Sequence, residues 1–235
     1  MEINYQQLGD IKKEYGRWIA QNWDTLENSS PKKLGYLIEF CEFSNPSNLE
    51  ELYEEYTSVP EYAQAFYAVV EEIIDKGNFG PIEGLHVAFI AVFYNTFQGY
   101  LAEEMLMHTL DRRYQLTVHK TPKDIDLKYA VDVVYKSTWP LDGTNEYEKG
   151  GIQLKSIHSR KNNNTNYISR NTKKNELFKK EYGINVEYWY YDSEYIPEDK
   201  SFNIVIISPE DLEPGGYYNP MPWDDKDNPL SNNTL

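Results

Sequence analysis

Two strand-like apolar segments of the chain each carry polar residues whose types suit chemistry at a phosphate. The first, YAVDVVYK, contains Asp132, and the second, GGIQLKS, contains Gln153 and Lys155. An ionised carboxylate in a half-buried strand costs several kcal/mol unless it is paired, hydrogen-bonded or bound to a metal. Because alternate residues of a strand point to the same side, Gln153 and Lys155 share one face. If the two strands are neighbours, the three side chains converge on one point of the sheet.

Such a trio can hold a divalent cation and a water molecule beside a phosphate. A hard cation such as Mg²⁺ prefers oxygen ligands, here the Asp132 carboxylate, the Gln153 amide oxygen and the backbone carbonyl of Leu154. The cation lowers the pKa of a bound water and offsets the charge that develops on the phosphate. Lys155 would orient or deprotonate that water and stabilise the transition state. The sequence therefore indicates metal-assisted hydrolysis of a phosphodiester.

The elements that must position these residues follow from the spacing of apolar side chains. Residues 1 to about 110 show helical spacing, with a long helix expected from about Glu83 to Leu110. After Tyr114 the chain becomes rich in Val, Ile, Tyr and Thr, which is typical of strands. The expected strands are 114–120, 128–136, 150–157, 184–192 and 202–212, with a helix over 171–183 between the third and the fourth. This order of elements predicts an α/β arrangement with a mixed sheet.

The same reading divides the chain into three parts. Residues 1–82 form a helical N-terminal region that could serve as a cap, a dimerisation surface or a partner-binding surface. One of its helices is expected to begin at a cap formed by Ser47 or Asn48, and the single cysteine, Cys41, is expected to be a buried thiol in another. Residues 83–212 form the catalytic core, and residues 213–235 an irregular acidic tail.

The spacing of Asp132, twenty residues, then Gln153-Leu154-Lys155 resembles the catalytic signature of the PD-(D/E)XK nuclease superfamily. That superfamily includes type II restriction endonucleases, Holliday-junction resolvases and many repair nucleases. The resemblance implies a core of helix, three strands, helix and strand, the order expected above from the residues alone. The fold class is therefore expected to be α/β (α+β), with a helical N-terminal half followed by a restriction-endonuclease-like mixed β-sheet core flanked by helices.

The resemblance also implies a glutamate on the leading helix. In GYLAEEML, Glu103 best matches that residue, with Glu104 as the alternative. Two positions depart from the pattern: Val131 precedes the aspartate where proline is usual, and Gln153 replaces an acid. Because Gln153 removes one negative charge, a single metal ion held by Asp132, with Glu103 as a direct or water-mediated ligand, is expected rather than two tightly held ions.

Other interpretations of these residues compete with a catalytic one. Asp124 and Asp126, expected in a loop or hairpin before the strand, are alternatives to Asp132 as the metal ligand. Asp132 could instead form a salt bridge with Lys128 or Lys136. The histidines show no HxH or HExxH spacing and the sequence has no GxxxxGK[ST] loop, so neither a zinc site nor ATP-driven action is expected.

The distribution of charge points to nucleic acid although the whole chain is acidic. The formal net charge is -15, but residues 108–180 hold 15 Lys and Arg against 8 Asp and Glu, or +7, which leaves -22 for the remainder. Positive side chains neutralise phosphates, and forked donors and amides suit phosphates and base edges. The residues expected to contact DNA are His158, Ser159, Arg160, Lys161, Asn162, Lys173 and Lys174.

The expected activity is thus that of a Mg²⁺-dependent endonuclease, with Mn²⁺ as a possible substitute, resembling a type II restriction enzyme that cuts a specific double-stranded site. A homodimer would supply the two active sites that cutting both strands requires, and a methyltransferase acting on the same site is a possible cognate partner. The alternatives are another nuclease of the superfamily, such as a junction resolvase or a phage or repair nuclease, and a non-catalytic binding module that keeps the fold. The sequence shows neither a membrane-spanning stretch nor a signal peptide, so a cytoplasmic location is expected.

Overall fold

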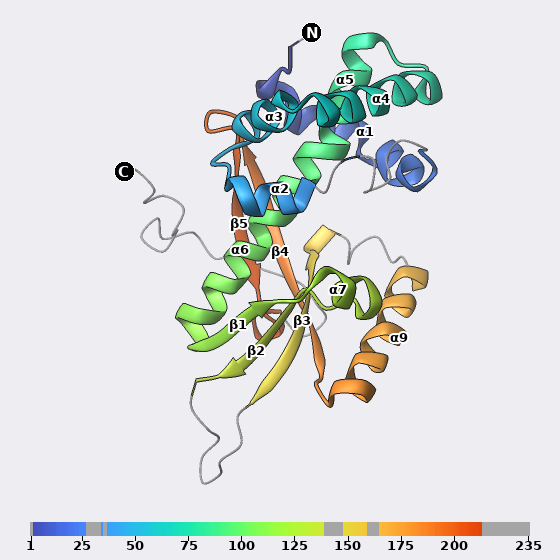
Figure 1. Ribbon diagram of the computed structural model, residues 1–235. Helices are drawn as coiled ribbons and strands as arrows, with labels where there is room; N and C mark the ends of the chain where they lie inside the picture. Colours follow the sequence, from blue (N-terminus) through green and yellow to red (C-terminus); the bar gives the residue numbers. More distant parts are fainter. Residues whose placement is uncertain (1, 27–33, 35–36, 139–147, 159–164, 213–235) are drawn as a thin grey trace.

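The computed structural model describes residues 2–26, 34, 37–138, 148–158 and 165–212, without the side chains of Asp24 and of residues 165–170 (Figure 1). A helical half is followed by a half built around one mixed, curled sheet. The helices are α1 (Leu8–Asn22), α2 (Leu37–Ser44), α3 (Leu49–Ser58), α4 (Pro60–Gly77), α5 (Pro81–Phe89), α6 (Asn95–Tyr114), α7 (Lys123–Tyr129) and α9 (Thr165–Tyr182). The strands are β1 (Leu116–Lys120), β2 (Val133–Ser137), β3 (Lys149–Ser156), β4 (Val186–Ile196) and β5 (Ser201–Ile207). The tail predicted from residue 213 onward lies outside the described residues.

The long helix predicted over 83–110 forms and extends to residues 81–114. It consists of α5, a π-helical turn over Ile90–Tyr94 and α6, and it runs from the helical half down to the sheet (Figure 1). All five residues of the π-helical turn are buried. The helix is therefore the element that joins the two halves, and the boundary expected at residues 82 and 83 falls inside its first turn.

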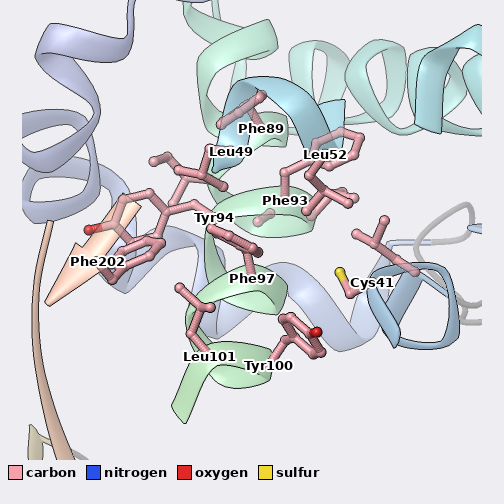
Figure 2. Close-up of a cluster of buried hydrophobic side chains, with 14 of the residues drawn as sticks. Cys41, Leu49, Leu52, Phe89, Phe93, Tyr94, Phe97, Tyr100, Leu101 and Phe202 are labelled. Carbon is pink, nitrogen blue, oxygen red and sulfur yellow. The ribbon is translucent and has the colours of Figure 1, made fainter. Parts of the chain in front are cut away.

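The core around this helix is rich in aromatic side chains. Figure 2 shows Phe89, Phe93 and Phe97 along the helix, with Leu49 and Leu52 of α3 beside them. Phe93 packs edge-on against Phe66 of α4 at a centroid separation of 5.0 Å. One continuous cluster of buried apolar residues extends from Leu8 in α1 to Ile204 in β5. The helical half and the sheet thus share one hydrophobic core among the described residues.

Helix α3 begins at the cap predicted from its sequence. The side chain of Asn48 accepts a hydrogen bond from the backbone N–H of Glu51 at 3.0 Å. The Glu51 carboxylate in turn accepts from the backbone N–H of Ser47 at 2.7 Å, and this contact with Ser47 lowers the pKa of Glu51. Asn48, rather than Ser47, is therefore the capping residue.

The sheet has the order β1-β2-β3-β4-β5, in which only β3 and β4 are parallel. The predicted mixed sheet is thus confirmed. The observed order departs from the predicted helix, three strands, helix and two strands, because helix α7 lies between β1 and β2. Helix α6 packs against β1 and β5 on one face of the sheet, whereas α7 and α9 pack together and cover part of the other face with Phe178 and Tyr129. Likeness of this core to restriction endonucleases remains a prediction.

One local prediction was wrong. Residues 128–136 were expected to form a strand preceded by a loop or hairpin, but residues 123–129 form helix α7 and β2 begins only at Val133. Ala130 ends α7 in the left-handed conformation, with φ at 54°, a region that residues other than glycine seldom adopt. This turn brings the chain from the helix into the sheet immediately before Asp132.

The glycine pair before Gln153 allows close packing between strands. A Cβ atom on Gly150 would lie 2.2 Å from the ring of Tyr135, which is its partner on β2. The absence of a side chain at this position therefore makes room for Tyr135. Within the described ranges, no helix has the length and apolar character needed to cross a bilayer.

We predict that Cys41 resists thiol reagents as long as the protein is folded. The residue is fully buried in α2, as its sequence context predicted, and burial raises the pKa of its thiol to about 12. Because the thiolate is the reactive form, modification by a disulfide reagent at about pH 8 should be at least about a hundredfold slower than in guanidinium chloride. Since the chain has one cysteine, the absorbance of the released thiolate reports this site alone. Rapid labelling of the folded protein would contradict the position given to α2.

Candidate functional site

Asp132 joins β1, β2 and β3 through its backbone and its carboxylate. Its N–H donates to the carbonyl of Ile152 at 2.9 Å, and its Oδ2 accepts from the N–H of Leu154 at 2.6 Å. Its carbonyl accepts from the N–H of Thr121 at 3.0 Å. Asp132 therefore contacts the residues on both sides of Gln153, and the expectation that the two polar strand segments are neighbours is confirmed.

The carboxylate of Asp132 lies on the wall of a cavity of about 650 Å³. Glu103 of α6 and Asp126 of α7 line the same cavity. The remaining lining residues come mainly from α2 and from the segment that links β1 to α7: Trp23, Leu34, Leu37, Ile38, Glu39, Glu42, Val92, Thr96, Lys120, Thr121, Pro122, Lys123 and Leu127. Glu103 of α6, Asp126 of α7 and Asp132 just before β2 thus line one cavity, together with Glu39 and Glu42 of α2.

Asp126 and Asp132 form a hydrogen-bonded carboxyl pair. The pKa of Asp132 is raised to about 6: burial raises it most, the ammonium of Lys155 lowers it and the contact with Asp126 raises it. Burial also raises the pKa of Asp126, while its hydrogen bond with Asp132 and the nearby Lys155 lower it. Two carboxylates in contact require a proton or a cation between them. Burial raises the pKa values of both carboxyl groups, so the pair holds a proton more tightly than two exposed aspartates would.

Glu103 is held by a lysine that the sequence did not single out. Lys120 of β1 lies 3.5 Å from Glu103, 2.9 Å from Glu104 and 3.1 Å from Glu42. The pKa of Glu103 is raised to about 7. Burial raises it most, Lys120 lowers it and the negative charge of Asp132 raises it. Glu103 lines the cavity beside Asp132, whereas Glu104 lines a different hollow with His108. Of the two glutamates, the geometry favours Glu103 as the one that acts with Asp132.

Gln153 and Lys155 differ in their surroundings, and only Lys155 lies close to the carboxyl pair. Gln153 is 2 % exposed and lies against Asn175 of α9, so its amide is enclosed by protein. Lys155 is half-buried and close enough to lower the pKa of both Asp126 and Asp132. Neither residue is among those that line the cavity in the described part of the chain. The roles of Gln153 and of the Leu154 carbonyl as metal ligands stay predictions.

Asn175 secures the turn that precedes Asp132. In one orientation of its side chain, the amide nitrogen faces the end of α7 and donates to the carbonyls of Tyr129 at 2.8 Å and Ala130 at 3.1 Å. The amide oxygen then accepts from the hydroxyl of Tyr188 at 3.1 Å. The opposite orientation would offer the nitrogen only a long contact of 3.4 Å to Gln153 besides Tyr188. We adopt the first orientation because it satisfies both ends of the amide. Asn175 is 8 % exposed, so this contact stabilises the left-handed turn at Ala130 from within the protein.

The residues predicted to bind DNA differ in how accessible they are. His158 is exposed and its Nε2 lies 3.4 Å from Oδ1 of Asp192. Lys173 is exposed on α9, whereas Lys174 donates to the carbonyl of Leu127 at 2.6 Å and so caps the end of α7. Lys174 also lowers the pKa of Asp126. The other predicted contacts, Ser159, Arg160, Lys161 and Asn162, lie outside the described residues.

Sequence reasoning missed or underweighted three members of the site. Asp126 was an alternative ligand in a supposed loop, but α7 places it against Asp132, whereas Asp124 is exposed. Lys120 gave no signal because its partners Glu42 and Glu103 are distant in the chain. Tyr191 of β4 read as an ordinary strand residue; burial, with the negative charges of Glu103 and Asp132, raises its pKa to about 12.

The described residues contain no group of three or more His, Cys, Asp or Glu arranged to hold a metal ion. Glu103 is instead held by Lys120, and Asp126 and Asp132 pair with each other. The oxygen donors nevertheless suit a hard cation, which could take the place of the proton in the Asp126–Asp132 pair.

We predict that Asp132→Asn stabilises the metal-free protein at neutral pH. The folded protein holds the Asp132 proton more tightly than the unfolded chain, so the stability it contributes is complete at low pH and is lost as pH rises through about 6. An asparagine carries no charge to bury, so in EDTA the variant should be more stable by about 1–3 kcal/mol at about pH 7.5, with no difference at about pH 3.

Thermal or urea unfolding across this pH range measures the difference, and Asp124→Asn is the matched control because Asp124 is exposed on the same helix as Asp126. The control should match the wild type at both pH values. If Asp132→Asn is no more stable than the wild type at neutral pH, burial of the Asp132 carboxylate does not destabilise the folded protein.

Comparison of the chain with protein-family models, with curated proteins and with solved structures found no match. The chemistry of these residues is therefore inferred from their own geometry and from the sequence pattern around them. The central features are the carboxyl pair of Asp126 and Asp132, the Glu103 carboxylate on the lining of the same cavity and Lys155 beside the pair.

Proposed function

We propose that the protein is a metal-dependent nuclease that hydrolyses DNA phosphodiester bonds at the cavity beside Asp132. The observation that carries this proposal is that Asp132, Asp126 and Glu103 line one cavity, with Lys155 next to the carboxyl pair. Such a set of acids is unfavourable for folding, because burial raises all three of their pKa values. Titratable groups that have shifted pKa values and lie together in a cavity are typical of functional sites.

The proposed cofactor is a Mg²⁺ ion, with Mn²⁺ as a substitute, because carboxylate and amide oxygens are the ligands that a hard cation prefers. Asp132 and Asp126 would hold it, with Glu103 as a direct or water-mediated ligand and Gln153 and the Leu154 carbonyl as the further ligands expected from the sequence. When bound, the ion would supply an activated water and charge stabilisation on the phosphate. The Gln153 position departs from the usual acid, and Asp126 restores the negative charge that this departure removes.

The chain's own groups would divide the remaining work. Lys155 would orient the attacking water and stabilise the charge that develops on the phosphate oxygens. Lys120 would hold Glu103 in place through their 3.5 Å contact. The hydrogen bond from the Leu154 N–H would fix the Asp132 carboxylate, since it joins Oδ2 to β3 at 2.6 Å.

Within this proposal, the form first expected is a type II restriction endonuclease that acts on a specific double-stranded site as a homodimer in the cytoplasm, alongside a methyltransferase for the same site. Another nuclease of the PD-(D/E)XK superfamily is the alternative. The duplex-binding role would fall to His158, Lys173 and the basic segment between them.

We predict that Asp132→Ala and Lys155→Ala each lower the rate of DNA cleavage by at least about a hundredfold, because each removes a group that acts on the charge or the water at the phosphate. The assay incubates plasmid and linear DNA of mixed sequence with Mg²⁺ or Mn²⁺ and maps the ends that form. DNA binding measured against salt concentration should persist in both variants.

Asp124→Ala is the matched control, since it removes an exposed carboxylate from α7 without touching the cavity, and it should cut at the wild-type rate. Normal cleavage by either site variant would place the active site elsewhere. A folded wild-type protein that cuts no DNA with any divalent metal would instead favour a binding module that keeps the fold.

A further inference from the structure

Apolar as well as acidic side chains line the cavity beside Asp132. Leu37 and Ile38 of α2, Val92 of the π-helical turn, Leu127 of α7 and Trp23 all line it. Ile38 is 47 % exposed and Leu127 is 64 % exposed, although both are large apolar residues. Two such side chains from different helices at one opening indicate a surface that another apolar group covers.

The volume of the cavity limits what that group can be. About 650 Å³ lies in the range of about 300–1,000 Å³ that small-molecule sites occupy. A nucleotide fits such a space, whereas a base that is stacked and paired in a duplex must leave the stack before it can enter a pocket. The carboxylates on the cavity wall are therefore accessible to a single strand or to a nucleotide displaced from a duplex.

The charges at the rim also disfavour two strands. Lys123 lies 2.6 Å from Glu39, and Lys120 lies 3.1 Å from Glu42, so α2 offers a carboxylate to each of these cations. Glu39 and Glu42 remain partly exposed, and their charge would repel a second phosphate backbone that lay across α2. A single strand brings one phosphate backbone to this surface instead of two and so meets less of this repulsion, and the divalent cation of the proposed nuclease site would offset the charge of the carboxylates near its phosphate.

We propose that this cavity binds an unpaired DNA nucleotide, with its base against Ile38 and Leu127 and its phosphate at the carboxylates. This inference rests on the proposed nuclease function and specifies its substrate: a strand that is single, frayed or locally unpaired at the point of cleavage. Apolar side chains bind the faces of unstacked bases without regard to sequence.

The test compares a fluorescein-labelled single-stranded oligonucleotide with a blunt hairpin of the same number of phosphates whose loop is a non-nucleotide polyethylene glycol linker, using the full chain with Ca²⁺ in place of Mg²⁺. Fluorescence anisotropy should show at least about tenfold tighter binding of the single strand. The double variant Ile38→Gln/Leu127→Gln should bind the single strand at least about tenfold more weakly than the wild type does. Its affinity for the hairpin should be unchanged, so the preference for the single strand should disappear. Both substitutions are at exposed positions and keep the net charge.

The matched control is Phe43→Gln/Ile82→Gln, which removes two apolar side chains that are 90 % and 63 % exposed and do not line this cavity. It should bind both oligonucleotides as the wild type does. Equal affinity for hairpin and single strand, no binding of either, or wild-type affinity in the cavity variant would overturn the inference.

Cleavage of the same two oligonucleotides with Mg²⁺ separates this inference from the nuclease proposal. If neither is cut but the single-strand preference exists and depends on Ile38 and Leu127, the nucleotide site stands and the nuclease proposal fails. If both are cut at equal rates and no preference appears in binding, the nuclease proposal stands and the nucleotide site is wrong.

Discussion

Two carboxyl groups, Asp126 and Asp132, share a hydrogen bond at the point where α7, β2 and β3 meet, and such a contact requires a proton or a cation between them. The surrounding residues offset the energetic cost of this contact only in part. Lys155 and the Leu154 N–H stabilise the charged form of Asp132, but burial outweighs them and keeps its pKa raised. A fold that maintains such a pair sacrifices stability, which is expected where the groups serve chemistry.

The rest of the molecule places partners around this pair. The continuous helix over residues 81–114 extends from the aromatic core of the helical half to the sheet and brings Glu103 to the cavity. Lys120 links Glu103 to Glu42, so α2 is tied to the same cluster of charges. On the opposite side, Asn175 fixes the left-handed turn at Ala130 that leads into Asp132. Both halves of the protein are thus needed to form one site.

Much of this arrangement could be predicted from the sequence, because it depends on local pattern. Strand-like runs and their order indicated a mixed sheet, and polar residues within those runs identified Asp132 and Lys155. Helix α7 was missed because its seven residues precede β-branched residues that made 128–136 resemble one strand. The Asp126–Asp132 contact then could not be foreseen, and neither could the Lys120 cluster, since both depend on tertiary packing between distant segments.

The most direct test of this account is the position of a bound metal ion. Crystals of the wild-type protein soaked with Mn²⁺ should show an anomalous scattering peak within coordination distance of oxygen atoms of Asp132 and Asp126, with Glu103 on the same side of the ion. The Asp132→Asn protein should show a much weaker peak or none at that place. Absence of a peak between Asp126 and Asp132 at saturating Mn²⁺, or a peak only at other residues, would contradict the assignment of this carboxyl pair as the metal site.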